Sequence, residues 1–197
     1  MHLVTVNEPP GPAERDNPRD LELLGRIARG DRRAFEAFYR NYHGRLTRFL
    51  ARLTAQQTVV EEVVNDTLWT VWRNAGAFRG GSQVSTWVMG IAWRCGLKAL
   101  RRTGPAAVEA PAAPGEAASY PFAEQETQQW IQAGLQQLPV EQRTTLELAY
   151  YFGHSLEEIA AIMECPLGTV KGRMFHARIK LRNLLPALGG AASGEKP

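Results

Sequence analysis

A segment in the middle of the chain combines basic and aromatic side chains at helical spacing. Arg94, Lys98 and Arg101 are four and then three residues apart, so on a helix they share one face. Trp87 and Trp93 lie in the same segment, after a glycine-rich stretch. Basic groups bind phosphates and aromatic faces stack on unpaired bases, so the pattern predicts contact with separated nucleic-acid strands. Core packing is the alternative: for Trp87 both roles stay open, and for Trp93, beside Arg94, we favour stacking.

A second cluster of basic residues follows a short apolar helix and a turn. Ser155 and Glu158 form a capping box ahead of about two helical turns, and the segment Cys165-Pro166-Leu167-Gly168 breaks that helix. The next helix carries only basic charges, at Lys171, Arg173, Arg178, Lys180 and Arg182, together with His176. This arrangement predicts a helix-turn-helix whose second helix reads the major groove of duplex DNA. A solvated basic helix in an ordinary bundle is the alternative.

Gly172 conflicts locally with that second helix, because glycine costs about 1 kcal/mol relative to alanine in a helix interior. Close approach of the backbone to DNA would explain it, and a tolerated glycine would explain it equally well.

A third candidate surface is polar and aromatic. It consists of Glu62, Asn65, Asp66, Trp69 and Arg73, which recur at steps of three and four opposite a Val/Leu stripe. An exposed tryptophan beside carboxylates is typical of a protein interface, and a solvated helix face is the alternative.

The sequence lacks the motifs that catalytic or metal chemistry requires. The histidines are His2, His43, His154 and His176, and they form no HExxH and no metal spacing with Cys95 or Cys165. A P-loop and GxGxxG are also absent, so we expect no enzyme, catalytic residue, cofactor or metal. The two cysteines make no disulfide framework, which favours a reducing cytoplasm. Cys165 is interpreted as a small packed thiol, with redox sensing as the alternative.

The charge distribution divides the chain into modules. Of 23 Lys+Arg and 20 Asp+Glu, residues 20–102 hold fourteen basic and seven acidic groups, whereas residues 103–129 hold four Glu and no base. We therefore expect two modules separated by an acidic linker, with at least one module facing a polyanion. Neither a secretory signal nor a transmembrane run is present in the sequence.

Helical periodicity dominates both modules, and strand alternation is almost absent. We predict an all-α fold, with Thr58 and Glu61 capping one helix and another running from Ser85 to about Arg102. The expected units are a flexible arm over 1–19, a first module over 20–102, an Ala/Pro-rich linker over 103–124, a second module over 125–186 and a disordered tail over 187–197.

These motifs resemble an extracytoplasmic-function (ECF) sigma factor of bacterial RNA polymerase. GDRRAFEAFYRNYHGRL, VVEEVVNDTLWTVWRNAGAFRG and SQVSTWVMGIAWRCGLKALRR are similar to sigma region 2, and LQQLPVEQRTTLELAYYFGHSLEEIAAIMECPLGTVKGRMFHARIKLR is similar to region 4. The resemblance implies promoter recognition and DNA opening together with core polymerase, and it implies control by an anti-sigma factor. A stand-alone helix-turn-helix repressor or activator is the alternative.

The resemblance also implies three sets of binding residues. The polymerase core, through its clamp coiled coil, would be met by Glu62, Asn65, Asp66, Trp69 and Arg73, and the flap would also be a partner. The −10 DNA would be met by Arg79, Ser82, Ser85, Trp87, Trp93, Arg94, Lys98, Arg101 and Arg102. The −35 DNA would be met by Ser155, Pro166, Thr169, Lys171, Gly172, Arg173, His176, Arg178 and Lys180. Because Arg94, Lys98 and Gly172 differ from the usual family residues, the promoter sequence does not carry over.

Overall fold

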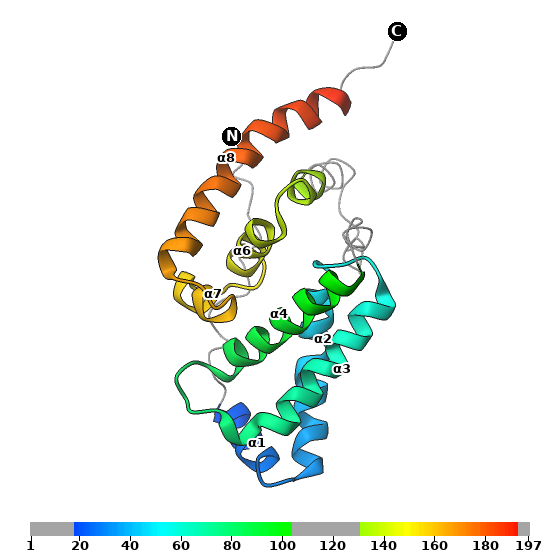
Figure 1. Cartoon of the computed structure of the whole chain (residues 1–197), viewed down its shortest axis with the longest axis vertical. Coiled ribbons are helices and arrows are strands. Elements are labelled where there is room, and N and C mark those ends of the chain that lie inside the picture. The colour runs from blue at the N-terminus through cyan, green and yellow to red at the C-terminus, as the bar shows by residue number, and fades with distance from the viewer. Residues whose placement is uncertain (1–17, 104–130, 193–197) are drawn as a thin grey trace, which may run out of the picture.

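The computed structural model describes residues 18–103 and 131–192, and within those ranges the chain contains helices and no strands. The predicted all-α fold is confirmed. The helices are α1 (Pro18–Ile27), α2 (Arg32–Leu50), α3 (Gln57–Asn74), the 3-10 helix η2 (Ala75–Ala77), α4 (Val84–Thr103), α6 (Val140–Tyr150), α7 (Leu156–Ile162) and α8 (Leu167–Ala192), and a helical turn over 131–136 precedes α6. Figure 1 shows α1 to α4 as one group and α6 to α8 as another.

The first module packs α2, α3 and α4 around a continuous core that α1 covers at one end. Phe38, Tyr42, Leu46 and Phe49 on α2 are buried, as their spacing of four, four and three residues predicts. At Gly96 of α4 an added Cβ would lie 2.9 Å from Leu53 Cδ1. Glycine at this position therefore lets α4 approach the end of α2 closely.

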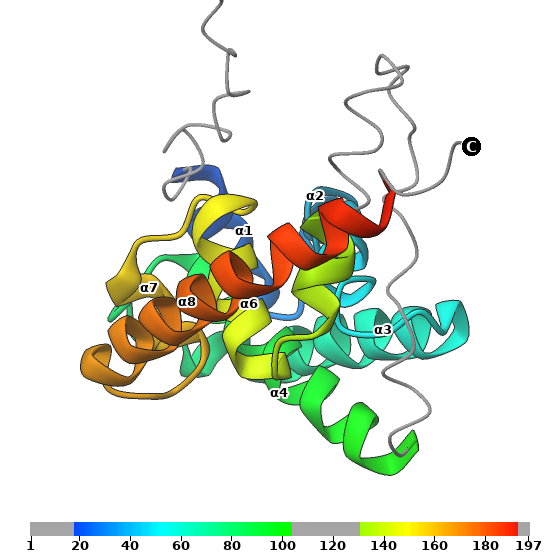
Figure 2. The same cartoon turned by 90° about the horizontal axis from the view of Figure 1, so that it is seen from above.

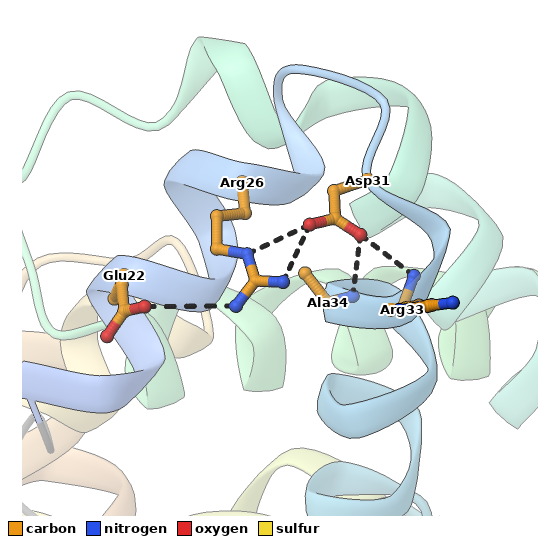
Figure 3. A network of polar contacts seen from close by, with 5 residues as sticks. All are labelled: Glu22, Arg26, Asp31, Arg33 and Ala34. Atoms are coloured by element: carbon orange, nitrogen blue, oxygen red, sulfur yellow. Dashed lines mark hydrogen bonds and ion pairs between the residues drawn. The ribbon is translucent and has the colours of Figure 1, made fainter.

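Asp31 joins α1 to α2 and starts the second helix (Figure 3). Its Oδ1 accepts from the backbone N–H groups of Arg33 at 2.9 Å and Ala34 at 3.1 Å, and its Oδ2 accepts from Arg26 Nη2 at 2.7 Å. The hydrogen bond from Arg26 lowers the pKa of the Asp31 carboxyl. The cap fixes α2, which carries much of the first module's core.

Two predicted helix boundaries are wrong. The Thr58–Glu61 capping box does not form, because α3 begins two residues earlier than a Thr58 N-cap requires, after an N-cap at Gln56 that makes no side-chain hydrogen bond. Gln57 Nε2 instead donates to Glu61 Oε1 at 3.1 Å. The expected arm ends too late, because α1 already begins at Pro18, and proline suits the first helical turn, where an N–H has no helical partner.

The second module contains the predicted helix-turn-helix. The capping box at Ser155 is confirmed, with Ser155 Oγ accepting from Glu158 N at 3.2 Å and Glu158 Oε2 accepting from Ser155 N at 2.7 Å. Glu164 adopts a positive φ of 50° in the turn, and α8 begins at Leu167. Val170, Met174 and Ala177 form the buried stripe of α8.

The disordered tail expected from residue 187 is wrong for residues 187–192, because α8 continues to Ala192. Extending an existing helix fixes only one residue per hydrogen bond, so the helix continues although Gly189 and Gly190 have low helix propensity. The rest of the expected tail, nearly all of the linker and the rest of the arm lie outside the described residues.

The two modules pack directly against each other, which the sequence did not predict. Helix α7 lies on α4, and both views show the second module seated on the first (Figures 1 and 2). The largest cluster of buried apolar residues spans both modules, joining Met89 and Ile91 of α4 to Ile159, Ile162 and Val170.

Candidate nucleic-acid and protein interfaces

One face of α3 carries the polar and aromatic surface expected from the sequence. Its members are all exposed: Glu62, Asn65, Asp66, Trp69 and Arg73. Trp69 is 58% exposed although it is a large apolar residue, while Val64, Leu68 and Val71 on the opposite face are buried. Asn65 Oδ1 accepts from the Tyr39 hydroxyl at 3.4 Å, which ties the surface to α2. An exposed tryptophan among carboxylates is suited to a protein partner.

Arg102 links this α3 surface to α4. Its Nη2 lies 2.8 Å from both carboxylate oxygens of Glu62. The hydrogen bonding to Glu62 raises the pKa of the Arg102 guanidinium above its usual value. Two residues expected to meet different partners, Glu62 the polymerase and Arg102 the DNA, are therefore paired with each other.

The exposed face of α4 carries the expected basic row. Lys98 and Arg101 are exposed, and Arg94 is exposed with its guanidinium ion-paired to Glu164 of the helix-turn-helix turn. Among the residues that the structure describes, neither Lys98 nor Arg101 forms an ion pair. These two side chains form a positive surface that can meet a phosphate backbone.

The glycine-rich loop between η2 and α4 holds the next group of expected residues. Arg79 is exposed, Ser82 is half-buried, and Gly80 adopts a positive φ of 69°, which turns the loop. Trp87 is half-buried, with its ring 5.4 Å from that of Phe78. Ser85 is buried and its hydroxyl lies 3.4 Å from Gln83 Oε1, so in this conformation Ser85 cannot reach DNA.

Trp93 corrects the sequence interpretation that favoured stacking on bases. The side chain is 3% exposed and belongs to the core cluster, so no base can stack on it in this conformation. Trp93 directly precedes Arg94 in the sequence, but successive residues of a helix do not share a face, and α4 has packed neighbours on more than one side. An i, i+4 pattern does not reveal a neighbour that comes from a distant part of the chain.

Helix α8 presents the expected recognition face to solvent. Thr169, Lys171, His176, Arg178 and Lys180 are exposed, and Gly172 is half-buried with nothing within 4 Å of an added Cβ. Arg178 donates to the Tyr150 hydroxyl, and Lys180 Nζ donates to Gln137 O at 2.8 Å. Both side chains therefore connect α8 to neighbouring segments of the same module.

The remaining residues expected to meet −35 DNA lie at the two ends of α7 and on α8. Ser155 and Pro166 are exposed, and the Ser155 oxygen is already engaged as the cap of α7. Arg173 is half-buried, with Nη1 3.5 Å from Cys165 Sγ and 4.0 Å from Met163 Sδ. The guanidinium thus lies against the turn and must swing outward to reach a base edge.

Phe175 is a surface residue that the sequence interpretation did not assign to binding. It is 61% exposed on α8, between the exposed residues Lys171 and His176. An apolar side chain on a recognition helix can contact a thymine methyl group. The available signal was its spacing, four residues after Lys171, on a helix whose buried stripe lies elsewhere.

The cysteines and acidic residues give no sign of a metal site in the described part of the chain. Within 18–103 and 131–192, no group of three or more His, Cys, Asp or Glu is placed to hold a metal ion. Cys95 and Cys165 are free and half-buried, and burial raises the pKa of the Cys95 thiol. Across the same ranges, none of the helices has the length and apolar composition to cross a bilayer.

The fold and these surfaces define a helical DNA-binding protein with a helix-turn-helix module and a second, basic and aromatic module. Family models agree: Sigma-70 region 2 matches residues 38–105, and Sigma-70, region 4 matches residues 128–181. The ECF RNA polymerase sigma factor SigM of Mycobacterium tuberculosis is 36% identical over 176 residues, which cover 87% of each chain. The RNA polymerase sigma-H factor of Pseudomonas aeruginosa is 30% identical over 184 residues, covering 86% of this chain and 95% of that one. The chain belongs to the ECF group of sigma-70 factors.

Two solved structures share this fold. CnrH, in complex with the cytosolic domain of CnrY, has the same fold, with a TM-score of 0.64 at 24% identity over 86% of this chain and 98% of CnrH. The sigma factor RpoE from Bartonella quintana, in complex with the anti-sigma factor NepR, gives a TM-score of 0.60 at 26% identity over 77% of this chain and 98% of RpoE.

Proposed function

We propose that this chain is an alternative sigma factor, which binds the RNA polymerase core and directs it to a set of promoters. The observation that carries the proposal is that the chain's two modules match sigma regions 2 and 4, each with a suitable exposed surface. The units are region 2 over 20–102 and region 4 over 125–186, joined by the acidic linker. In this role the protein acts in the cytoplasm and performs no catalysis, because the polymerase supplies the chemistry.

The α3 surface binds the polymerase clamp coiled coil. Glu62, Asn65, Asp66, Trp69 and Arg73 are its contact residues, and their exposure beside a rigid buried stripe supports this role. Trp69 is the apolar anchor and the carboxylates provide charge complementarity. The second module meets the polymerase flap.

The −10 element is opened and held by the loop over 78–83 and by α4. Arg79, Lys98 and Arg101 are exposed and positively charged, which suits contact with phosphates. Trp87, packed beside Phe78, lines the place where a base leaves the stack. Arg94 and Arg102 join this set once their carboxylate partners are displaced.

The −35 element is read by α8 in the major groove. Thr169, Lys171, Phe175 and His176 face solvent on this helix, and Ser155 and Pro166 lie at the edge of the same module. Lys171 and Arg178 suit phosphates or guanine edges, and Phe175 suits a thymine methyl group.

An anti-sigma factor controls the protein in this proposal. The similarity to RpoE, solved in complex with the anti-sigma factor NepR, supports such a partner. The partner would bind where the polymerase or the promoter otherwise binds.

Run-off transcription tests the proposal. The purified chain is mixed with bacterial core polymerase and a pool of genomic promoter fragments from its own source. We expect discrete transcripts that require the chain, and Asp66→Arg should abolish them by weakening core binding while the fold is kept. A stand-alone regulator would instead bind duplex promoter fragments specifically without polymerase and yield no new transcripts.

A further inference from the structure

The turn between α1 and α2 carries a compact group of cations, Arg29, Arg32 and Arg33. All three side chains are exposed, and in the part of the chain that the structure describes none of their guanidinium groups forms an ion pair. Gly30 adopts a positive φ of 83°, which reverses the chain between the two helices and brings the three residues to one end of the first module. We call these three side chains the turn arginines.

The carboxylates near the turn do not neutralise this group. Asp31 is already engaged, because it accepts from Arg26 and from the first backbone N–H groups of α2 (Figure 3). Glu22 lies 3.8 Å from Arg26 as well. Glu36, the next acid along α2, is exposed and forms no ion pair within residues 18–103 and 131–192. The backbone donors of this helix end are thus occupied, while the turn arginines remain available to a partner.

Helix stability does not explain two of these cations. Arg32 and Arg33 occupy the first two positions of α2, directly after its N-cap, and the first turn contains no acid. The helix dipole favours anions at this end and cations at the other end. Both arginines therefore oppose the local preference without packing in the core. Residues that break a local rule in this way occur mainly at functional sites.

The turn lies beside the loop that we propose for the −10 element. Helix α1 contacts η2, and an added Cβ at Gly76 of η2 would lie 3.9 Å from Ala28 Cβ. Figures 1 and 2 both show η2 alongside α1. Arg29 follows Ala28, and Arg79 lies three residues after Gly76, so their Cα atoms are no more than about 22 Å apart at 3.8 Å per residue. A strand held by the loop can therefore reach the turn within about seven nucleotides at 3.4 Å each.

We propose that the turn arginines bind phosphates of the promoter strand where it continues beyond the −10 element. A single strand is the expected form, because in the proposed function the adjoining loop holds an unpaired base and the opened strand continues from it. Guanidinium groups pair with phosphate oxygens, so the contact adds affinity without reading sequence. The inference rests on the proposed function for the identity of the DNA, whereas phosphate binding at the turn is a property of the chain alone.

Removing one charge at a time tests the proposal. The variants are Arg29→Gln, Arg32→Gln and Arg33→Gln, and the matched control is Arg48→Gln in the last turn of α2. Arg48 is exposed and has no ion pair within the described ranges. It lies about 24 Å from Arg32 along the helix at 1.5 Å per residue. This distance exceeds the Debye length of about 8 Å at physiological salt, so the control removes the same charge without affecting the turn.

Binding of a fluorescent oligothymidine strand of about 20 nucleotides to the full chain measures the contact. Losing one phosphate contact lowers the salt slope by about 0.7, which corresponds to about eightfold weaker binding at about 50 mM salt and about threefold at about 200 mM. We expect this loss for each turn variant and none for Arg48→Gln. A duplex of the same length should show a smaller loss. Unchanged binding, an equal loss for Arg48→Gln or a loss on the duplex alone would each overturn the proposal.

Thermal unfolding separates binding from a structural role. Arg32→Gln and Arg33→Gln remove a cation from the first turn of α2, so they should keep or raise the melting temperature. Arg48→Gln removes a favourable cation from the last turn and should lower the melting temperature slightly. Weaker DNA binding together with a lower melting temperature in all three turn variants would show that they act through the fold, which would overturn the proposal.

Run-off transcription with core polymerase connects the contact to the promoter. The turn variants should lose transcripts more steeply than the parent as salt rises, while they bind core polymerase as the parent does. Loss of core binding with both DNA probes unchanged would assign the turn to the polymerase and refute the DNA contact. If the parent itself yields no transcripts, the sigma function fails, and the oligothymidine measurement still decides whether the turn binds phosphates.

Discussion

Helices α4 and α8 carry two of the surfaces that we propose for DNA, but the rest of the protein surrounds the two helices to very different extents. In α4, the buried residues include Met89, Ile91, Trp93 and Gly96, and they lie on more than one side of the helix. In α8, over residues 167–184, only Val170, Met174 and Ala177 are buried. The comparison shows that α4 is a core element with one exposed basic face, whereas α8 is supported along a single buried stripe.

The largest expected difference between the helices comes from truncating one aromatic residue on each. Trp93→Ala should lower the free energy of unfolding by about 3–5 kcal/mol, because it leaves a cavity in the core of α4. Phe175→Ala on α8 should change it by no more than about 0.5 kcal/mol, because the side chain is 61% exposed. Urea unfolding followed by circular dichroism measures both. Equal effects would mean that the burial contrast does not exist in solution.

Two glycines provide a sharper, matched version of that comparison. Gly96→Leu should destabilise the protein by about 1–3 kcal/mol, since its Cβ would already lie 2.9 Å from Leu53 Cδ1 and the longer side chain overpacks the core. Gly172→Leu meets nothing within 4 Å at Cβ and should stabilise α8 by up to about 1 kcal/mol through helix propensity. Thermal unfolding should therefore shift in opposite directions, and a shared direction would contradict the packing difference.

The same contrast explains which features could be predicted from sequence. Local signals were sufficient for the Ser155 capping box, the turn at Cys165-Pro166 and the exposed face of α8, because each depends on residues within a few positions. They were insufficient for Trp93, whose burial depends on how α4 packs in the whole molecule. The Thr58 cap failed because several residues near a helix start can serve as its boundary.

The contact between the two modules was the feature that the sequence could not predict at all. Gly90 and Ile162 come from opposite sides of the linker, and Arg52 and Glu147 are likewise distant in sequence. No periodic pattern pairs such residues, because an apolar helix face indicates burial but not which distant segment covers it.

Charged residues on α8 should separate reading of bases from attraction to phosphates. Arg173→Ala should cost about 1–3 kcal/mol at one −35 base pair, provided that the guanidinium leaves the Cys165 and Met163 sulfurs and pairs with a base edge. Lys171→Ala, at an exposed position, should weaken binding to all sequences alike and reduce the salt slope by about one. The two variants are distinguished by measuring how tightly the holoenzyme binds promoter DNA. The measurement uses a panel of single base changes in the −35 element and several salt concentrations. A uniform loss for Arg173→Ala would assign that residue to phosphate.

The smallest expected difference concerns the two thiols, Cys95 within α4 and Cys165 just before α8. Both are half-buried, but burial raises the pKa of the Cys95 thiol above its usual value. The thiolate is the reactive form, so at neutral pH Cys95 should react with iodoacetamide more slowly than a thiol of ordinary pKa. Its rate should keep rising with pH beyond that usual value, because the thiolate fraction is still increasing there. The single variants Cys95→Ala and Cys165→Ala isolate each thiol for mass-spectrometric rate measurement, with a free thiol peptide as the standard. A Cys95 rate that levels off below the usual thiol pKa would show that α4 is less enclosed than its packing implies.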